Sequence, residues 1–247
     1  MRIKAVIAYD GSSFEGFQRQ TRTSNTITTA LENALHSLGI ESPLIGSGRT
    51  DAGVHATGQV IHLDLPSYWN DMAKLRTHLN GRLHHIQVKH IAPVADDFHA
   101  RFDANRRVYR YLFSERPLSV FEQSYVAHVG SLDLPRLRKA LQLFEGEHDF
   151  EYFMKSGSEV HHTVRTIHRT RLQSWGRYGV VYFEANGFLR AQVRMMLHAA
   201  FDVAQNNTNM KILEEQIAHH RRHTTRLAPP QGLYLARVIY YTLQIPK

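Results

Sequence analysis

Residues 46–63 read GSGRTDAGVHATGQVIHL, a glycine-rich turn that runs into a short apolar strand. The first eight of these residues include three glycines, which let a backbone turn sharply and let a ligand approach it closely. The turn also carries the guanidinium of Arg49, the carboxylate of Asp51 and, just beyond, the imidazole of His55. This concentration of polar groups makes the turn the first candidate for a functional segment.

Residue types alone leave two interpretations of Asp51 open. An Asp-Ala-Gly sequence commonly forms an Asx-turn, in which the carboxylate hydrogen-bonds its own backbone. The alternative is a carboxylate that acts on a ligand. A phosphate-binding loop is disfavoured, because no Gly-Lys-Ser/Thr follows the glycines and no helical pattern begins there.

Apolar spacing around this turn predicts the order strand, helix, strand, strand, helix, strand in the first half of the chain. These segments are residues 3–7, 27–38, 43–45, 59–63, 71–79 and 86–91. The order repeats with longer pieces at residues 108–113, 134–144, 164–172, 180–184, two helices at 188–204 and 211–219, and 233–241. The expected class is α+β, with residues 1–100 and 101–247 forming two ferredoxin-like halves that share one mostly antiparallel sheet.

The composition limits the classes of function. The 247 residues contain 30 Lys and Arg against 22 Asp and Glu, a formal charge of +8 that favours a polyanionic partner such as nucleic acid. Cysteine is absent, which excludes disulfides, thiolate metal sites and a cysteine nucleophile. No apolar run approaches about eighteen residues, so no membrane segment is expected. The first residues lack the pattern of a signal peptide, so a cytoplasmic location is expected.

Gly48–Ala56, with Gln59 and Val60 after it, resembles the signature of the bacterial tRNA pseudouridine synthase A family. Six further blocks match motifs of that family in order, at residues 9–18, 98–111, 146–153, 165–167, 187–194 and 228–235. Together the blocks cover nearly the whole chain, so chance agreement is not credible. One departure is Gln192, which stands where the family usually has Met.

The resemblance implies the pseudouridine synthase fold, with helices on one side of the sheet and a central basic cleft. It implies an isomerase that converts uridine to pseudouridine at positions 38, 39 and 40 in the anticodon stem-loop of tRNA. An isomerisation of this kind requires no cofactor and no catalytic metal. The family works as a homodimer, so the expected partners are tRNA and a second copy of the chain.

The resemblance also implies the catalytic groups. It places the family's essential aspartate at Asp51 and the arginine that pairs with it at Arg194. A paired guanidinium keeps a carboxylate ionised and oriented. Tyr109 matches the active-site tyrosine, whose ring can stack under the flipped uracil while its hydroxyl assists proton transfer.

Three further residues are expected to bind the substrate. Arg49 matches the arginine that serves base displacement. Leu233 matches an apolar residue that packs near the base, although a core leucine fits the pattern nearly as well. For His55 two roles stay open, contact with the substrate or a hydrogen bond within the turn.

The histidine-rich segment His219–His223 allows two interpretations. Imidazoles three or four residues apart can bind zinc, but no carboxylate accompanies them at a recognised spacing, so an RNA-facing basic patch is favoured. A second basic patch is expected where Arg190, Arg194 and His198 share one helix face. The rival functions are an RNA-binding module without catalysis, a histidine-rich metal hydrolase and a related enzyme that acts on another RNA.

Overall fold

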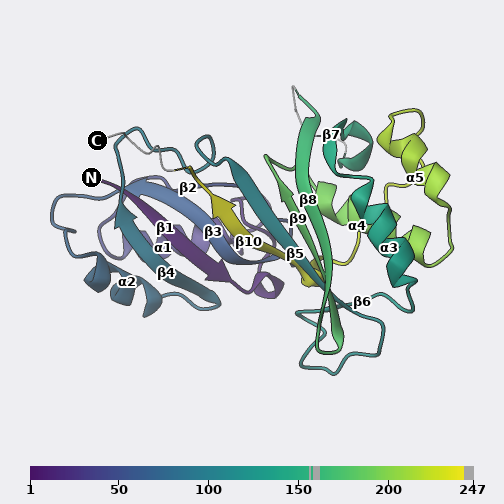
Figure 1. The fold of residues 1–247 in the computed structure, drawn as a ribbon. Helices are drawn as coiled ribbons and strands as arrows, with labels where there is room; N and C mark the ends of the chain where they lie inside the picture. Colours follow the sequence, from purple (N-terminus) through teal and green to yellow (C-terminus); the bar gives the residue numbers. More distant parts are fainter. Residues whose placement is uncertain (156, 158–161, 242–247) are drawn as a thin grey trace. The chain divides into compact units, whose positions relative to one another are not determined.

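The computed structural model describes residues 1–155, 157 and 162–241 (Figure 1). The chain divides into two compact units. The first consists of Met1–Asn105 and the chain from Tyr234 onward, and the second of Arg106–Leu233. These units differ from the predicted halves, 1–100 and 101–247, chiefly in the last strand, which groups with the N-terminal segment.

Four strands of the first unit have the order of a ferredoxin-like half. They are β1 (Arg2–Tyr9), β2 (Ile45–Gly46), β3 (His55–Asp64) and β4 (Ile86–Pro93). β1 lies between β3 and β4 and pairs antiparallel with both, while the short β2 pairs antiparallel with the second half of β3. Alternate residues of β1 are buried, as its apolar alternation predicts, namely Ile3, Ala5, Ile7 and Tyr9.

Two helices connect these strands, α1 (Ile27–His36) and α2 (Met72–Asn80). Thr26 caps α1 and Asp71 caps α2, each through a side-chain oxygen that accepts a hydrogen bond from a backbone N–H of the first turn. Each helix buries an apolar stripe at helical spacing, Ile27, Leu31 and Leu35 in α1 and Leu75 and Leu79 in α2. The predicted positions of both helices are confirmed.

The last strand, β10 (Leu233–Ile239), pairs in parallel with the beginning of β3, where Tyr234 lies opposite His55. Gly58 permits this approach, because a Cβ there would lie 2.3 Å from the carbonyl oxygen of Ala236. The pairing brings a late segment of the chain next to the turn that carries Asp51.

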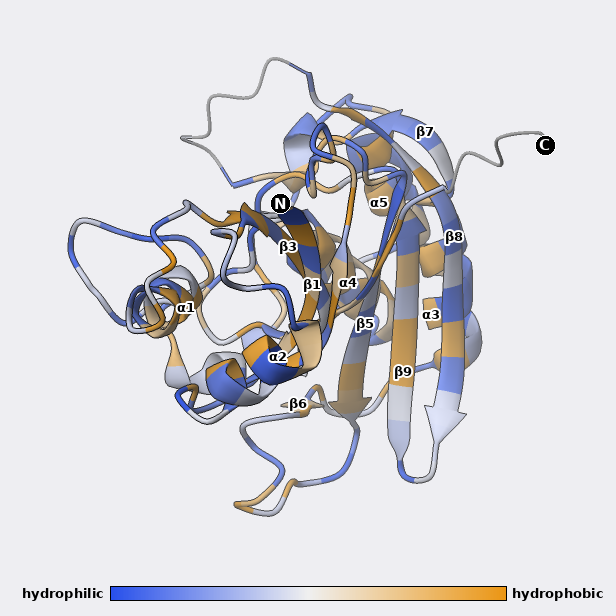
Figure 2. Ribbon diagram, turned by 90° about the vertical axis from the view of Figure 1, so that its left-hand side faces the viewer, coloured by the Kyte–Doolittle hydropathy of each residue, from blue (hydrophilic) through white to orange (hydrophobic). Residues whose placement is uncertain are grey.

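The second unit is built around β9 (Tyr178–Ala185), which pairs antiparallel with β5 (Arg106–Ser114) and β8 (Val164–Trp175). Two short strands extend the pairing, β6 (Ala127–His128) parallel to β5 and β7 (Gly146–Asp149) antiparallel to β8. Hydrophilic residues predominate along β8 (Figure 2). The buried residues of this strand are Ile167 and Thr170.

Three helices lie on the same side of β8 and β9 (Figure 1), α3 (Leu134–Gln142), α4 (Gln192–Ala204) and α5 (Met210–Ile217). α3 has Pro135 in its first turn and Asp133 as its cap. The core of this unit is aromatic. Phe150 and Phe153, in the matched block at residues 146–153, are 0% exposed, so that block contributes to the core.

The α+β class and the mostly antiparallel strand pairing are confirmed. The helix predicted from residue 188 was wrong at its start, because Ala191 has a φ of 60° and α4 begins at Gln192. Arg190 therefore lies outside α4, which corrects the predicted three-residue basic face.

The elements that were not predicted are short: β6, β7 and the 3-10 turns η1 (Gly11–Ser13), η2 (Glu151–Phe153) and η3 (Pro230–Gly232). Among the described residues, no helix combines the length and apolar character needed to cross a membrane.

Candidate active site

The turn that carries Asp51 is anchored at Thr50. Thr50 is 7% exposed, and its hydroxyl lies 2.9 Å from the hydroxyl of Tyr9. Its carbonyl accepts a hydrogen bond of 3.0 Å from the backbone N–H of Phe17. On either side of this anchor, Arg49 is exposed and Asp51 is half-buried. The buried residue therefore fixes the backbone between two of the predicted functional side chains.

Burial also keeps the hydroxyl of Tyr9, the partner of Thr50, in its neutral form. It raises the pKa of the Tyr9 hydroxyl well above its ordinary 10, because the ionised form would lose its hydration. With Tyr9 protonated, one hydrogen bond joins its hydroxyl to that of Thr50, and either hydroxyl can be the donor.

Gln59 ties the glycine-rich part of the turn to β3. Its side chain is fully buried, and its Nε2 donates a hydrogen bond of 2.9 Å to the carbonyl of Gly48. Its Oε1 accepts a hydrogen bond of 2.6 Å from the hydroxyl of Ser47. A buried amide that holds two loop residues at once restricts the path of the backbone.

The block at residues 9–18 lies directly against this turn. A Cβ at Gly11 would lie 2.0 Å from the carbonyl oxygen of Val54, and a Cβ at Gly16 would lie 3.2 Å from that of Thr50. Gly16 also has a φ of 115°, which disfavours any side chain. The sequence analysis did not predict that this block supports the turn. The two glycines, five residues apart, were the feature of the sequence that could have indicated a close backbone contact.

His55 connects three of the matched blocks. It is 1% exposed, and its Nδ1 accepts a hydrogen bond of 3.0 Å from the backbone N–H of Gly11. Its ring stacks on Tyr234 of β10, with 4.6 Å between the centroids. The same Nδ1 also lies 3.3 Å from the carboxylate of Asp10. The burial favours the structural role of His55, and its contact with substrate stays a prediction.

In the second unit, Arg194 lies in the first turn of α4, where the partial positive charge of the helix N-terminus disfavours a cation. Its Nε donates a hydrogen bond of 2.8 Å to the carbonyl of Ala228, whose N–H donates in turn to the Arg194 carbonyl at 2.9 Å. The Ala228–Gly232 segment thus fixes both the backbone and the guanidinium. The pairing of Arg194 with Asp51 stays a prediction.

The start of α4 depends on Gln192, the residue that departs from the family motif. Ala191 provides no side-chain cap, and its left-handed backbone costs about 1–2 kcal/mol. Gln192 is fully buried, and its Oε1 accepts a hydrogen bond of 2.7 Å from the backbone N–H of Leu189. The polar residue therefore satisfies a buried donor at the bend that precedes Arg194.

β5 carries two tyrosines on one face. Tyr109 is 8% exposed, and its ring meets the edge of Phe188 at 5.1 Å between centroids. Tyr111 is fully buried, donates to the carbonyl of Pro229 at 3.0 Å, and has its pKa raised by burial. Tyr111 is therefore a core residue. The catalytic role of Tyr109 stays a prediction.

Leu233 follows directly after η3 and is 5% exposed. The preceding Gly232 lies so close to β5 that a Cβ there would come within 2.6 Å of the carbonyl oxygen of Leu112. The segment that holds Arg194 is therefore also packed against the strand that carries Tyr109. Contact between Leu233 and a substrate base stays a prediction.

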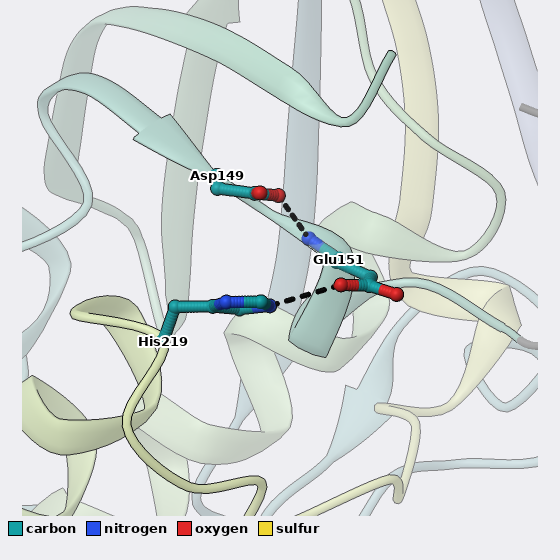
Figure 3. A group of neighbouring side chains, drawn as sticks. All are labelled: Asp149, Glu151 and His219. Atoms are coloured by element: carbon teal, nitrogen blue, oxygen red, sulfur yellow. Dashed lines mark hydrogen bonds and ion pairs between the residues drawn. The ribbon is translucent and has the colours of Figure 1, made fainter. Parts of the chain in front are cut away.

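The fold supplies carboxylates to the histidine-rich segment that the sequence spacing does not reveal. Asp149, Glu151 and His219 offer ligand atoms within 4.8 Å of one another (Figure 3). The Nε2 of His219 lies 3.0 Å from the carboxylate of Glu151, and Asp149 accepts from the Glu151 backbone N–H at 3.0 Å. His223 lies apart from this group, with its Nε2 3.1 Å from the carboxylate of Glu215. The two histidines thus contact different carboxylates, and the predicted RNA-facing role of the segment stays a prediction.

The predicted site residues fall into two sets, one in each unit. Within the first unit, a single supported turn brings together Arg49, Asp51 and His55. Within the second unit, the Ala228–Gly232 segment links α4 to β5, the elements that carry Arg194 and Tyr109.

Comparison with known proteins identifies the family. A family model described as tRNA pseudouridine synthase matches residues 5–103 and 140–241. A tRNA pseudouridine synthase A of Wolinella succinogenes is 40% identical over 237 residues, which cover 96% of this chain and 93% of that protein. A protein of the same name from Helicobacter hepaticus is 42% identical, over 96% of this chain and 98% of that protein. Another from Campylobacter jejuni is 39% identical, over 97% of this chain and 100% of that protein. The chain therefore belongs to the tRNA pseudouridine synthase family.

Proposed function

We propose that this protein isomerises uridine to pseudouridine in tRNA, at positions 38, 39 and 40 of the anticodon stem-loop. Family membership over nearly the whole chain is the observation that carries the proposal. In this reaction the bond from uracil N1 to ribose C1′ breaks and a bond from C5 to C1′ forms. The C5 proton is released and N1 gains a proton, so atoms and electrons balance without a cofactor.

Asp51 is the proposed essential carboxylate. A carboxylate beside a sugar carbon can act as a nucleophile or stabilise positive charge that develops there. The anchoring of Thr50 to Tyr9 and Phe17 supports this role, because a catalytic group must be held within a fraction of an ångström of its target. Attack at C1′, attack at C6 and removal of a C2′ proton are all compatible with such a group.

The other proposed roles follow the chemistry of the side chains. Arg194 keeps Asp51 ionised, and Tyr109 stacks on the extracted uracil and assists proton transfer. Arg49 occupies the space that the extracted base leaves, which its exposed position on the turn allows. Leu233 packs near the base. A homodimer in the cytoplasm is the proposed working form, which light scattering and fractionation would test.

Release of tritium from tRNA labelled at uridine C5 tests the reaction. The wild-type protein should release tritium without added cofactor, and mapping of the product should place pseudouridine in the anticodon stem-loop. Asp51→Asn should abolish release and retain most tRNA binding, because phosphate contacts supply most of the affinity. Asp96→Asn, at an exposed position of the same unit, is the matched control and should keep full activity.

Two of the alternative functions, the RNA-binding module and the enzyme that acts on another RNA, have their own outcomes in this experiment. Tight tRNA binding with no release from any substrate would favour an RNA-binding module. Release from another RNA only would identify a different substrate. Release by Asp51→Asn at the wild-type rate would refute the proposed catalytic role.

A further inference from the structure

Phe102 projects into solvent from a turn that is built to hold it. Its side chain is 74% exposed. The imidazole of His99 stacks on its ring, with 4.2 Å between centroids and 28° between the planes. The guanidinium carbon of Arg101 lies 5.6 Å from the same ring. The exposed aromatic is thus supported by two neighbours that favour flat, polarisable partners.

The turn itself is fixed by hydrogen bonds at both ends. The Nδ1 of His99 accepts from the backbone N–H groups of Arg101 and Phe102, both at 3.2 Å. The carboxylate of Asp103 accepts from the His99 N–H at 2.7 Å, and the Asp103 N–H donates to the His99 carbonyl at 3.0 Å. The ring that stacks on Phe102 therefore also sets the backbone from which Phe102 projects.

The base of this turn is anchored in the first unit. Ala100 is fully buried, and its N–H donates to the Nδ1 of His62 at 3.1 Å. The Ala100 carbonyl accepts a hydrogen bond of 2.6 Å from the hydroxyl of Tyr240. A rigid support matters because it removes the entropy that a flexible loop would lose on binding.

Single exposed apolar residues are common and by themselves signify little. Phe102 differs because one ring is already stacked on it and its backbone is held from both sides. Residues 95–103 contain three Asp and one Arg, so the segment itself carries more acidic than basic side chains. A ligand recognised here would be held through a flat apolar face rather than through charge.

We propose that Phe102, supported by His99, is a stacking platform for an unpaired nucleobase of the RNA substrate. Unstacked bases of RNA loops are recognised by stacking on aromatic side chains, and the contact tolerates any base. The inference rests on the proposed function, since it supposes an RNA substrate. It adds a binding site that lies outside the turn of Asp51 and takes a base by its face.

Binding of unmodified tRNA to the full-length protein tests this site. Phe102→Ala should raise the Kd about 10-fold, the usual effect of losing one stacked base. The dependence of Kd on salt should stay unchanged, because no phosphate contact is lost. Phe102→Trp should bind as tightly as wild type, since it keeps the stacking face. Phe121→Ala is the matched control, because Phe121 is 86% exposed in the other unit, and it should bind normally.

Stem-loop RNAs with one abasic nucleotide each make the test sharper. If the missing base is the one that stacks on Phe102, the abasic RNA should bind the wild-type protein about 10-fold more weakly than the intact RNA does. The same abasic RNA should bind Phe102→Ala with the Kd that it shows for the wild-type protein. An unchanged Kd in Phe102→Ala, a changed salt dependence, or a change in oligomeric state would overturn the proposal. Tritium release by wild type is measured separately, so failure of the proposed reaction is distinguishable from failure of this site.

Discussion

The Nδ1 of His55 accepts a hydrogen bond of 3.0 Å from the backbone N–H of Gly11, which joins the first matched block to the turn of Asp51. Both groups are buried, so neither has water as an alternative partner. Through the ring stack on Tyr234, the same imidazole also contacts β10. One side chain therefore holds segments that lie far apart in the sequence.

Replacing His55 by Ala should destabilise the fold by about 2–4 kcal/mol, since it leaves a buried donor unsatisfied and opens a cavity. Thermal or urea unfolding measures the change, with the exposed His90→Ala as control. A variant of normal stability with weakened tRNA binding would instead point to the substrate contact.

The hydroxyl pair of Tyr9 and Thr50 should show coupling in a double-mutant cycle. Tyr9→Phe and Thr50→Val each remove one partner of a buried hydrogen bond, at about 1–2 kcal/mol. The double variant should lose less than the sum of the two, by about 1 kcal/mol. Additive losses would mean that the contact contributes nothing by itself.

Gly11→Ala should shift the turn that carries Asp51, because the new Cβ would lie 2.0 Å from the carbonyl oxygen of Val54. Overpacking of this kind costs about 1–3 kcal/mol. We expect a loss of turnover larger than the loss of stability explains, measured by tritium release on folded protein. Gly81→Ala is the control, since its nearest neighbour atom lies 3.6 Å away. Equal turnover in the two variants would contradict this argument.

Arg194→Lys should reduce kcat by about 10- to 100-fold, while the lost hydrogen bond should cost only about 1 kcal/mol of stability. The substitution keeps the charge but removes the Nε–H that donates to the carbonyl of Ala228, and Lys lacks the planar fork that holds a carboxylate. Single-turnover kinetics measures the effect. Arg190→Lys, at an exposed position before α4, is the control. Wild-type turnover by Arg194→Lys would show that only the charge matters.

Stability should fall as the pH drops below 6.5 in part because of His62. Burial lowers the pKa of its imidazole below the ordinary 6.5, and the nearby His99 and Arg2 lower it further. Between the lowered pKa and 6.5 the unfolded chain binds a proton that the folded chain does not, so acid favours unfolding, whereas above 6.5 the contribution is constant. His62→Gln should flatten the fall of Tm in the pH range below 6.5, where the unfolded chain binds the proton first. An unchanged slope would exclude His62 as a cause.

The elements of the fold could be predicted where they depend on local periodicity. The alternation of Ile3, Ala5 and Ile7 and the stripe of Ile27, Leu31 and Leu35 reflect strand and helix geometry that neighbouring residues determine. The start of α4 could not be predicted in this way, because it depends on the left-handed backbone of Ala191, which the buried Gln192 supports. No residue type at position 191 signals that conformation.

The sequence by itself determined the family, the class of fold and the residues proposed for the chemistry, because residue type and order within short blocks carry that information. Only the tertiary structure decided which residues support them: that His55 is buried against Gly11, that Ala228 holds Arg194, and that Asp149 and Glu151 reach His219. Such contacts join segments that are distant in the chain. They arise when strand pairing and core packing bring those segments together, and no local pattern of residue types encodes the distances.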